Sequence, residues 1–225
     1  MTDAGYRTEV LCQWVTAQVN SYIEVTDWEK CQQEPLAVYR HIPKDPRVMW
    51  ALDVSEDRKY TWLAQAIELD DGRVFTQVVE RKHGTLWVPK YIQDELIPHF
   101  DTMDICVQSR GCPASEFLDT FKSVESLKDR VRVHALDGGK IGMATGRFRD
   151  RVRDRILVHT GQPLVKLAVE SGVTKQIAEN FAWNRVGSLF DIAGLVAETE
   201  AVYGLETVEP EDATSEYEDH DLMSF

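Results

Sequence analysis

The alternation of apolar and polar positions predicts strands in the middle of the chain. Residues 48–54 form a short apolar run that contains one acid near its end, and residues 60–69 form a second extended segment. The turn Asp70-Asp71-Gly72 then leads into the alternating residues 73–81, so we expect the second and third strands to form a hairpin. Three consecutive strands therefore begin the main fold.

Helical spacing and short apolar runs alternate after these strands. The spacing predicts two further strands, over 104–108 and 131–136, and five helices, over 86–100, 113–122, 142–158, 162–171 and 186–203. Three strands followed by alternating helices and strands is the order of the ribonuclease-H-like α/β fold, a mixed sheet with flanking helices. The same order fits other α/β folds, so by itself it assigns no function.

We expect three regions along the chain. Residues 1–46 are a helical entry segment and linker, because apolar residues recur at helical spacing over 6–31 and a proline-bearing passage follows. Residues 47–205 form the α/β domain. Residues 206–225 carry eight acids and no Lys or Arg, which predicts an acidic disordered tail.

The net charge of −13 argues at first against a nucleic-acid partner. The tail contributes eight of these negative charges, however, and the stretch from Lys140 to Arg155 is basic. The arginines of this stretch are candidates for contacts to DNA phosphates: Arg147, Arg149, Arg151, Arg153 and Arg155. A solvated helix face linked by ion pairs is the equally weighted alternative.

Other features exclude several classes of protein. The four cysteines show no zinc-ligand spacing, so we expect free thiols at Cys12, Cys31, Cys106 and Cys112. The sequence has no run of about 18 apolar residues and no secretory leader, so we expect no membrane contact and a location in the cytoplasm. It also lacks the GxxxxGK(S/T) loop with which P-loop ATPases bind ATP.

Two aspartates occupy positions suited to metal chemistry. Asp53 ends an apolar strand, where a carboxylate is costly to bury unless it is paired or metal-bound. Asp191 lies at the start of the last predicted helix. Each also has an ordinary structural interpretation: Asp53 as a strand-end residue facing solvent, and Asp191 as a helix cap.

Four groups of local stretches follow one another along residues 6–204. They are Tyr6-Arg7-Thr8-Glu9-Val10-Leu11-Cys12-Gln13-Trp14 with Trp28; Ala51-Leu52-Asp53-Val54-Ser55-Glu56-Asp57-Arg58 with Gly84-Thr85-Leu86-Trp87-Val88; Gly111-Cys112-Pro113-Ala114; and His159-Thr160-Gly161-Gln162-Pro163-Leu164 with Ala168-Val169, Trp183-Asn184-Arg185 and Asp191-Ile192. In order and spacing they resemble the nuclease (C-terminal) domain of the large terminase subunits of tailed phages, particularly those of actinobacterial phages.

The resemblance implies a divalent-metal-dependent endodeoxyribonuclease that cuts concatemeric phage DNA during genome packaging. It makes Asp53 and Asp191 ligands of Mg²⁺ or Mn²⁺, with two ions expected and Asp53 bridging both. Gln108 stands where the family usually has an aspartate, so we expect one ion to bind more weakly. Asp57, Asp104 and Glu116 are the nearby acids considered as replacements.

The implied partners are double-stranded DNA, a terminase ATPase domain or subunit, the small terminase subunit and the portal. Without an ATP-binding loop, the chain is either a separately encoded half of a terminase or an excised domain. One alternative is a catalytically weak or inactive module of the same fold that docks DNA, the ATPase or the portal. Another is a regulatory DNA-binding protein with a helix-turn-helix over 173–187. For His159 we consider a proton shuttle and, as the favoured alternative, a packed or capping histidine.

Overall fold

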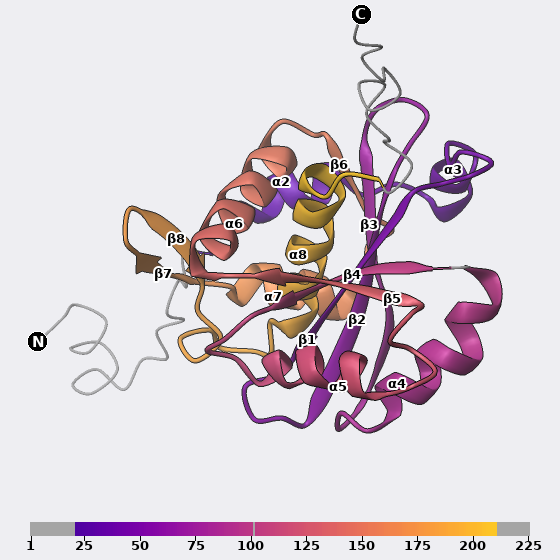
Figure 1. Cartoon of the computed structure of the whole chain (residues 1–225). Helices are drawn as coiled ribbons and strands as arrows, with labels where there is room; N and C mark the ends of the chain where they lie inside the picture. Colours follow the sequence, from indigo (N-terminus) through magenta and orange to yellow (C-terminus); the bar gives the residue numbers. More distant parts are fainter. Residues whose placement is uncertain (1–20, 101, 211–225) are drawn as a thin grey trace, which may run out of the picture.

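A six-stranded mixed sheet lies between two helical layers in the computed structural model, which describes residues 21–100 and 102–210 (Figure 1). The strands stand in the order β5-β4-β1-β2-β3-β6. Their bounds are β1 (Val48–Val54), β2 (Tyr60–Glu68), β3 (Val74–His83), β4 (Met103–Gln108), β5 (Val131–Leu136) and β6 (Leu157–Val158). The first three strands are antiparallel, β4 runs parallel to β1, and β5 runs parallel to β4.

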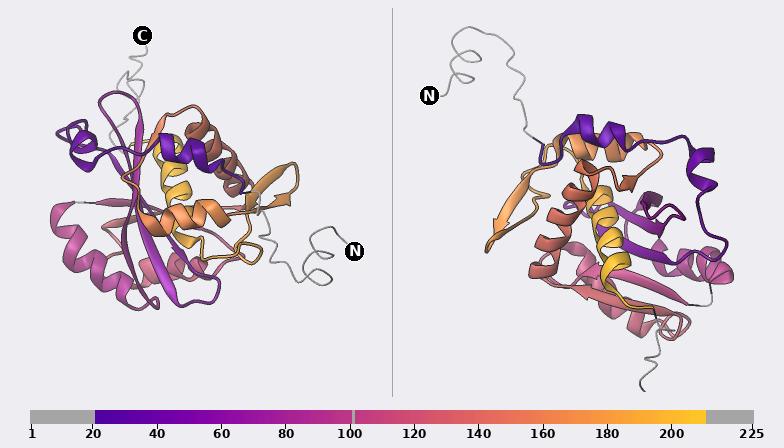
Figure 2. Two further views of the ribbon diagram at one scale, coloured as in Figure 1. Left: turned by 180° about the vertical axis from the view of Figure 1, so that it is seen from behind. Right: turned by 90° about the horizontal axis from the view of Figure 1, so that it is seen from above.

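Helices cover both faces of this sheet (Figures 1 and 2). One layer contains α2 (Val25–Lys30), α6 (Gly138–Arg153), α7 (Pro163–Ser171) and α8 (Ala193–Thr207). The other contains α4 (Trp87–Tyr91), the π-helix η1 (Ile92–Leu96), the 3₁₀-helices η2 (Ile97–His99) and η3 (Pro113–Glu116), and α5 (Phe117–Ser123). Each layer buries its own apolar cluster against the sheet. The predicted mixed α/β class is confirmed, and the predicted order of elements holds as far as β5 and α6.

The helix α8 is the most deeply placed element. Residues 193–205 are all buried, although a helix on the surface of a domain normally keeps one polar face. Two glycines allow this close packing: a Cβ atom at Gly204 would collide with the Cys106 sulfur, and one at Gly194 would meet the Trp62 ring at 2.7 Å. These contacts also set α8 in register with the strands beneath it.

Several predicted boundaries are wrong. The helix predicted over 142–158 begins earlier, where Asp137 caps it by accepting from Lys140 N at 2.9 Å, and ends at Arg153. Beyond it, Leu157 and Val158 are buried in β6 beside β3, because the sheet edge offers an apolar pair more burial than another helical turn. The last predicted helix begins at Ala193, and residues 186–192 form a loop instead.

The two ends of the chain also differ from the expectation. Residues 6–20 of the predicted entry helix lie outside the described residues, and the helical part that follows is α2. The linker contains a short helix, α3 (Pro35–Tyr39). Glu206 and Thr207, assigned to the acidic tail, complete α8, whereas residues 211–225 lie outside the described part.

The region considered as a helix-turn-helix is a β-hairpin. Its strands β7 (Thr174–Ile177) and β8 (Asn180–Trp183) pair antiparallel and extend away from the main sheet (Figure 2). No recognition helix is therefore present over 173–187, all of which the structure describes, and the helix-turn-helix hypothesis is wrong. The thiol prediction is confirmed for Cys31, Cys106 and Cys112, which are free, while Cys12 lies outside the described residues.

His159 packs against α2 and holds it to the rest of the domain. Its ring stacks on Trp28 with centroids 3.9 Å apart, Nε2 bonds the Trp28 carbonyl at 2.8 Å, and Nδ1 accepts from Gly161 N at 3.0 Å. The second bond requires an unprotonated Nδ1, so Nε2 carries the hydrogen and donates. Both nitrogens of this buried ring are engaged in structural bonds, which favours a packing role over the suggested proton shuttle.

His159 should make folding stability depend on pH. Burial lowers its pKa from 6.5 to about 4. Below pH 6.5 His159 therefore becomes protonated in the unfolded chain but stays neutral in the folded chain. We expect this group to reduce the free energy of unfolding by about 2 kcal/mol between pH 7.5 and pH 5. Urea titrations of the protein and of His159→Gln at both pH values measure this difference. An equal pH dependence in the two proteins would contradict it.

Candidate functional site

Asp53 and Gln108 lie side by side at the ends of two central strands. The β1–β4 register pairs Ala51 with Cys106, so two residues further along both strands Asp53 stands beside Gln108 on the same face. Trp62 is the cross-strand partner of Asp53 on β2. Strand alternation therefore directs all three side chains to the face that α8 covers.

Arg185 joins the first two of these residues. It belongs to the loop that follows β8, and its Nε donates to Asp53 Oδ2 at 2.7 Å. One terminal nitrogen of the same guanidinium donates to Gln108 Oε1 at 3.1 Å. Asp53 is fully buried and the Arg185 side chain is only 14% exposed, so this is a buried ion pair rather than a surface one.

Asp191 reaches the same region through Trp62. The Trp62 Nε1 donates to Asp191 Oδ2 at 2.8 Å, and the main-chain N of Ala193 donates to Asp191 Oδ1 at 2.9 Å. The second bond satisfies a main-chain N–H at the beginning of α8, where Asp191 directly precedes the N-cap residue Ile192. One carboxylate thus both fixes the start of the helix and faces the site.

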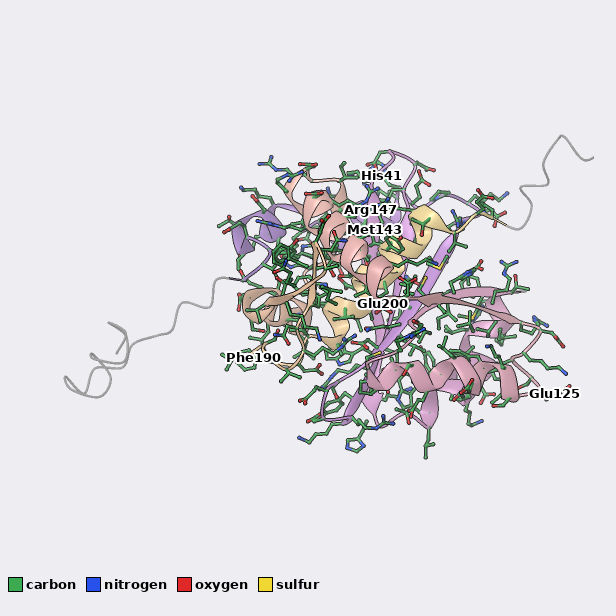
Figure 3. All side chains as sticks on the ribbon, turned by 60° about the vertical axis from the view of Figure 1, so that its left-hand side comes forward. His41, Glu125, Met143, Arg147, Phe190 and Glu200 are labelled. Carbon is green, nitrogen blue, oxygen red and sulfur yellow. The ribbon has the colours of Figure 1, made fainter. Side chains whose placement is uncertain are left out.

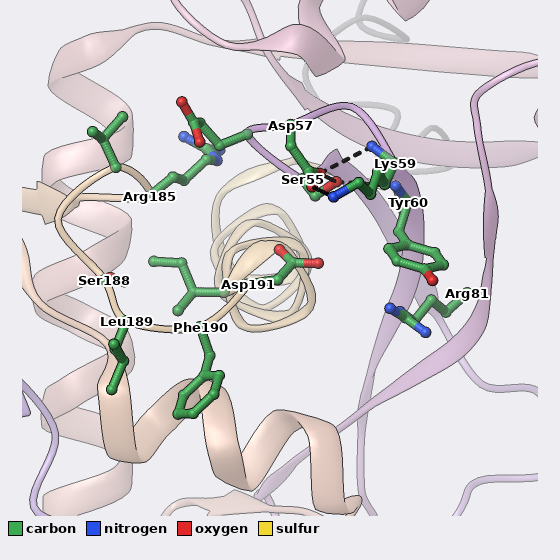
Figure 4. Close-up of a pocket in the computed structure, with 13 residues that line it drawn as sticks. Ser55, Asp57, Lys59, Tyr60, Arg81, Arg185, Ser188, Leu189, Phe190 and Asp191 are labelled. Atoms are coloured by element: carbon green, nitrogen blue, oxygen red, sulfur yellow. Dashed lines mark hydrogen bonds and ion pairs between the residues drawn. The ribbon is translucent and has the colours of Figure 1, made fainter.

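A cleft of about 420 Å³ opens beside these residues. Figure 4 shows Asp191 directed into it, with Arg185 on one side and Arg81 with Tyr60 on the other. The Arg81 guanidinium lies 3.4 Å from the centre of the Tyr60 ring. Asp53 does not line the cleft, because it lies behind Arg185.

The electrostatics of Asp53 reflect its burial. Loss of water contact raises the pKa of its carboxyl above the usual range, while the charge and hydrogen bond of Arg185 act in the opposite direction. The negative charge of Asp191 raises it further, which shows that the two carboxylates interact across the site. A cation near both would favour their ionised forms.

Glu200 is a site residue that the sequence reasoning missed. It is 1% exposed on α8, and neither of its carboxylate oxygens has a hydrogen-bond partner in the described part of the chain. Burial raises its pKa well above the usual value, Asp53 raises it further and Arg185 lowers it. An available signal was the placement of two acids, Glu198 and Glu200, within a helix that is otherwise mostly apolar.

Three acids considered as replacements for the missing aspartate are bonded to other residues, although Asp57 also lines the cleft. Asp104, near the beginning of β4, is bonded to Arg132 at 2.7 Å and to His134 at 2.7 Å. Asp57 bonds Ser55 and Lys59, and Glu116 bonds Arg58 at 2.7 Å. All three have side-chain partners outside the group formed by Asp53, Gln108 and Arg185.

The donor chemistry of the site fits a hard divalent cation. Asp53 Oδ1 and both Glu200 oxygens are buried acceptors without partners among the described residues, and carboxylate oxygens are the ligands that Mg²⁺ and Mn²⁺ prefer. Within residues 21–100 and 102–210, no three His, Cys, Asp or Glu side chains are already arranged around one point. Arg185 supplies the positive charge beside Asp53 instead.

Most of the arginines on α6 form ion pairs. Arg151 and Arg147 both face Glu206, the latter at 3.6 Å, and Arg153 pairs with Asp150 and Asp154. Arg149 lies over the Tyr22 ring at 4.7 Å. These contacts agree with the alternative interpretation, a helix face linked by ion pairs, and a role in DNA binding stays a prediction.

Comparison of the fold with solved structures gives matches to one class of protein. The large terminase of bacteriophage HK97 aligns with a TM-score of 0.61 at 17% identity, covering 82% of this chain and 43% of that one. The large terminase nuclease of thermophilic phage G20c with bound magnesium aligns at 0.56 and 9% identity, covering 82% and 98%. The large terminase nuclease domain of Thermus phage P74-26 aligns at 0.54 and 11%, covering 82% and 96%.

This chain has the fold of a terminase nuclease domain. It spans less than half of the HK97 large terminase but nearly all of the isolated G20c and P74-26 nuclease domains. No protein-family model and no curated protein matches the sequence. The resemblance noted in the local sequence stretches and the predicted ribonuclease-H-like class are thus confirmed at the level of the terminase nuclease fold.

In this structure Asp53, Gln108 and Asp191 lie around one end of the sheet, and their role as metal ligands stays a prediction. The structure also shows a residue that the sequence analysis did not select: the buried Arg185, which donates hydrogen bonds to Asp53 and to Gln108. Among the described residues, no helix is long and apolar enough to cross a membrane.

Proposed function

We propose that this chain is a divalent-metal-dependent DNA endonuclease that cuts phage DNA during genome packaging. The observation that carries the proposal is Asp53, a fully buried carboxylate at the end of the central strand β1, with one oxygen that lacks a partner among the described residues. Arg185 pairs with the other oxygen, so the oxygen without a partner is the one that a cation can use. The terminase nuclease fold supports the choice of DNA as the substrate.

Asp53 and Asp191 are the residues proposed to hold Mg²⁺ or Mn²⁺. When bound, such cations lower the pKa of water and offset negative charge on the phosphate, and two of them suit an in-line displacement. Arg185 holds Asp53 Oδ2 and thereby leaves Oδ1 for a cation. Trp62 and the start of α8 fix the Asp191 carboxylate, so both acids are held by protein donors before any ligand arrives.

The walls of the cleft supply groups for binding the DNA backbone. Lys59, Arg81 and Arg185 line it, and phosphate contacts of this kind fix position without reading base sequence. Further phosphate contacts are proposed for four arginines on α6 and one just beyond its end: Arg147, Arg149, Arg151, Arg153 and Arg155. Because Arg147 and Arg151 face Glu206, DNA would have to compete with that carboxylate for them.

Cleavage of supercoiled plasmid tests this proposal. We expect nicked and linear products with Mg²⁺ or Mn²⁺ and none with EDTA, because the carboxylates alone cannot activate water at neutral pH. Ca²⁺ provides a matched control, since it binds oxygen ligands in looser geometry. Absence of cleavage with both Mg²⁺ and Mn²⁺, at protein concentrations that retard the plasmid on a gel, would contradict the proposal.

A second candidate function is a non-catalytic module of the same fold. It is favoured by the glutamine at position 108 and by the guanidinium that already neutralises Asp53. Such a module would dock double-stranded DNA, the terminase ATPase domain or subunit, the small subunit or the portal. Retention of the plasmid without cleavage, unchanged by Asp53→Asn, would support this function over the first.

A further inference from the structure

Glu200 lies between α8 and the sheet, inside the molecule (Figure 3). Its position follows from the register of α8. Gly204 rests on Cys106, and Glu200 is four residues earlier, on the same face of the helix and about 6 Å closer to its beginning. Gln108 is two residues beyond Cys106 on the same face of β4, about 6.6 Å further along the strand.

These two displacements point in the same direction. The beginning of α8 packs on Trp62, the partner of Asp53, and its end packs on Met49 at the other end of β1. The helix therefore runs antiparallel to β1 and β4, and one turn back along α8 corresponds to two residues forward along β4. Glu200 is thus opposite Gln108 and next to Asp53.

Electrostatic interactions agree with this placement. The charge of Asp53 raises the pKa of Glu200, whereas the charge of Arg185 lowers it. Asp53, Gln108, Arg185 and Glu200 therefore lie within reach of one another. Two buried carboxylates face a single guanidinium, so the group lacks one positive charge when both are ionised.

A buried carboxylate without hydrogen bonds destabilises a fold unless something else requires it. Replacing such a group by an apolar side chain of similar size is commonly neutral or stabilising. Glu200 sits on a helix whose neighbouring positions are mostly small or apolar, so packing alone would accept such a residue there. A charged residue nevertheless occupies position 200. It lies beside Gln108, which stands where the resemblance implies an aspartate.

We infer that Glu200 supplies from α8 the carboxylate that Gln108 no longer supplies from β4, as a ligand of the divalent cation held by Asp53. The inference rests on the proposed function, and it identifies the third acidic ligand of that site. Gln108 then serves to hold the guanidinium of Arg185 through its amide oxygen. The negative charge lost from one element is restored from the helix packed against it.

The test is Mn²⁺ binding by isothermal titration calorimetry, on the folded protein and without DNA. Glu200→Gln should weaken binding by about 10- to 100-fold, because it removes one anionic oxygen ligand of a hard cation. Glu198→Gln is the matched control: Glu198 is equally buried on the same helix, but it interacts with the main chain of Val78 on β3 and not with Asp53. This control should bind Mn²⁺ as the unaltered protein does.

A rescue separates a ligand from a structural role. In Gln108→Asp/Glu200→Gln the acid returns to β4, and we expect Mn²⁺ affinity to recover to within about threefold of the unaltered protein. Thermal unfolding in EDTA should show each variant folded, with Glu200→Gln at least as stable as the parent because a buried charge is gone.

The outcomes distinguish this inference from the proposed function. Equal Mn²⁺ affinity in Glu200→Gln and Glu198→Gln, in a protein that binds Mn²⁺ and cleaves plasmid, would overturn the inference and leave the endonuclease proposal intact. Weakened binding without rescue by Gln108→Asp would overturn it as well, since Glu200 would then act through structure. If the unaltered protein neither binds Mn²⁺ nor cleaves plasmid, both the Glu200 inference and the endonuclease proposal are refuted.

Discussion

Asp53→Asn should lower the rate of metal-dependent plasmid cleavage by more than about 100-fold, because it removes the anionic oxygen that stands nearest to the proposed cation. The amide keeps the size of the side chain and still accepts from Arg185 through one oxygen. The loss should therefore arise from charge and ligand chemistry and not from packing. Initial rates of plasmid nicking in Mg²⁺ measure it.

Asp71→Asn is the control for this comparison. Asp71 lies in the β2–β3 turn, where it forms a surface pair with Arg73 at 2.6 Å, remote from the β1 end that carries Asp53. Purified in the same way, this variant should cleave as the parent does, which excludes a contaminating nuclease. Equal rates for Asp53→Asn and Asp71→Asn would remove Asp53 from the reaction.

Arg185→Met should reduce the free energy of unfolding in EDTA by about 3–5 kcal/mol. The substitution leaves the buried Asp53 and Glu200 carboxylates with no guanidinium between them, and each already has a raised pKa because of burial. At neutral pH one or both must take up a proton or remain charged without a partner, and either state destabilises the fold. Urea unfolding followed by tryptophan fluorescence measures the change.

A divalent cation should offset part of this loss. Mn²⁺ that binds only the folded variant raises its stability by mass action, and it restores the positive charge that Arg185 supplied. Arg73→Met, which breaks only the surface pair with Asp71, should cost less than about 1 kcal/mol. A loss no larger for Arg185→Met than for Arg73→Met would show that the buried pair contributes little to stability.

Hydrophobic patterning predicted the central elements well. The strand over 131–136 coincides with β5, and 48–54 coincides with β1, because short apolar runs carry the strand signal within themselves. The weaker predictions concern elements whose state depends on distant partners. The sequence pattern places Leu157 and Val158 at the end of a helix. In the structure they form β6, because they pair with the distant strand β3.

The last helix shows a related limit. Residues 186–192 have apolar residues at helical spacing, but the chain there forms the loop that carries Arg185 and Asp191 into the site. Arg185 lies 132 positions from Asp53 in the sequence, so no local pattern could pair them. From the sequence, Gln108 indicated only that one acidic ligand is missing. The local sequence does not show which residue of a distant helix packs opposite this position.

The sequence by itself determined the order of the main elements, the placement of Asp53 at the end of a buried strand and the resemblance to terminase nucleases. These properties follow from local spacing and from residue types at fixed positions along the chain. Only the tertiary structure decided that Arg185 neutralises Asp53 and that Glu200 lies opposite Gln108. Burial and charge pairing arise between elements that fold together from distant parts of the chain, so the electrostatics of the site become defined only when α8 and the β8–α8 loop close over the sheet.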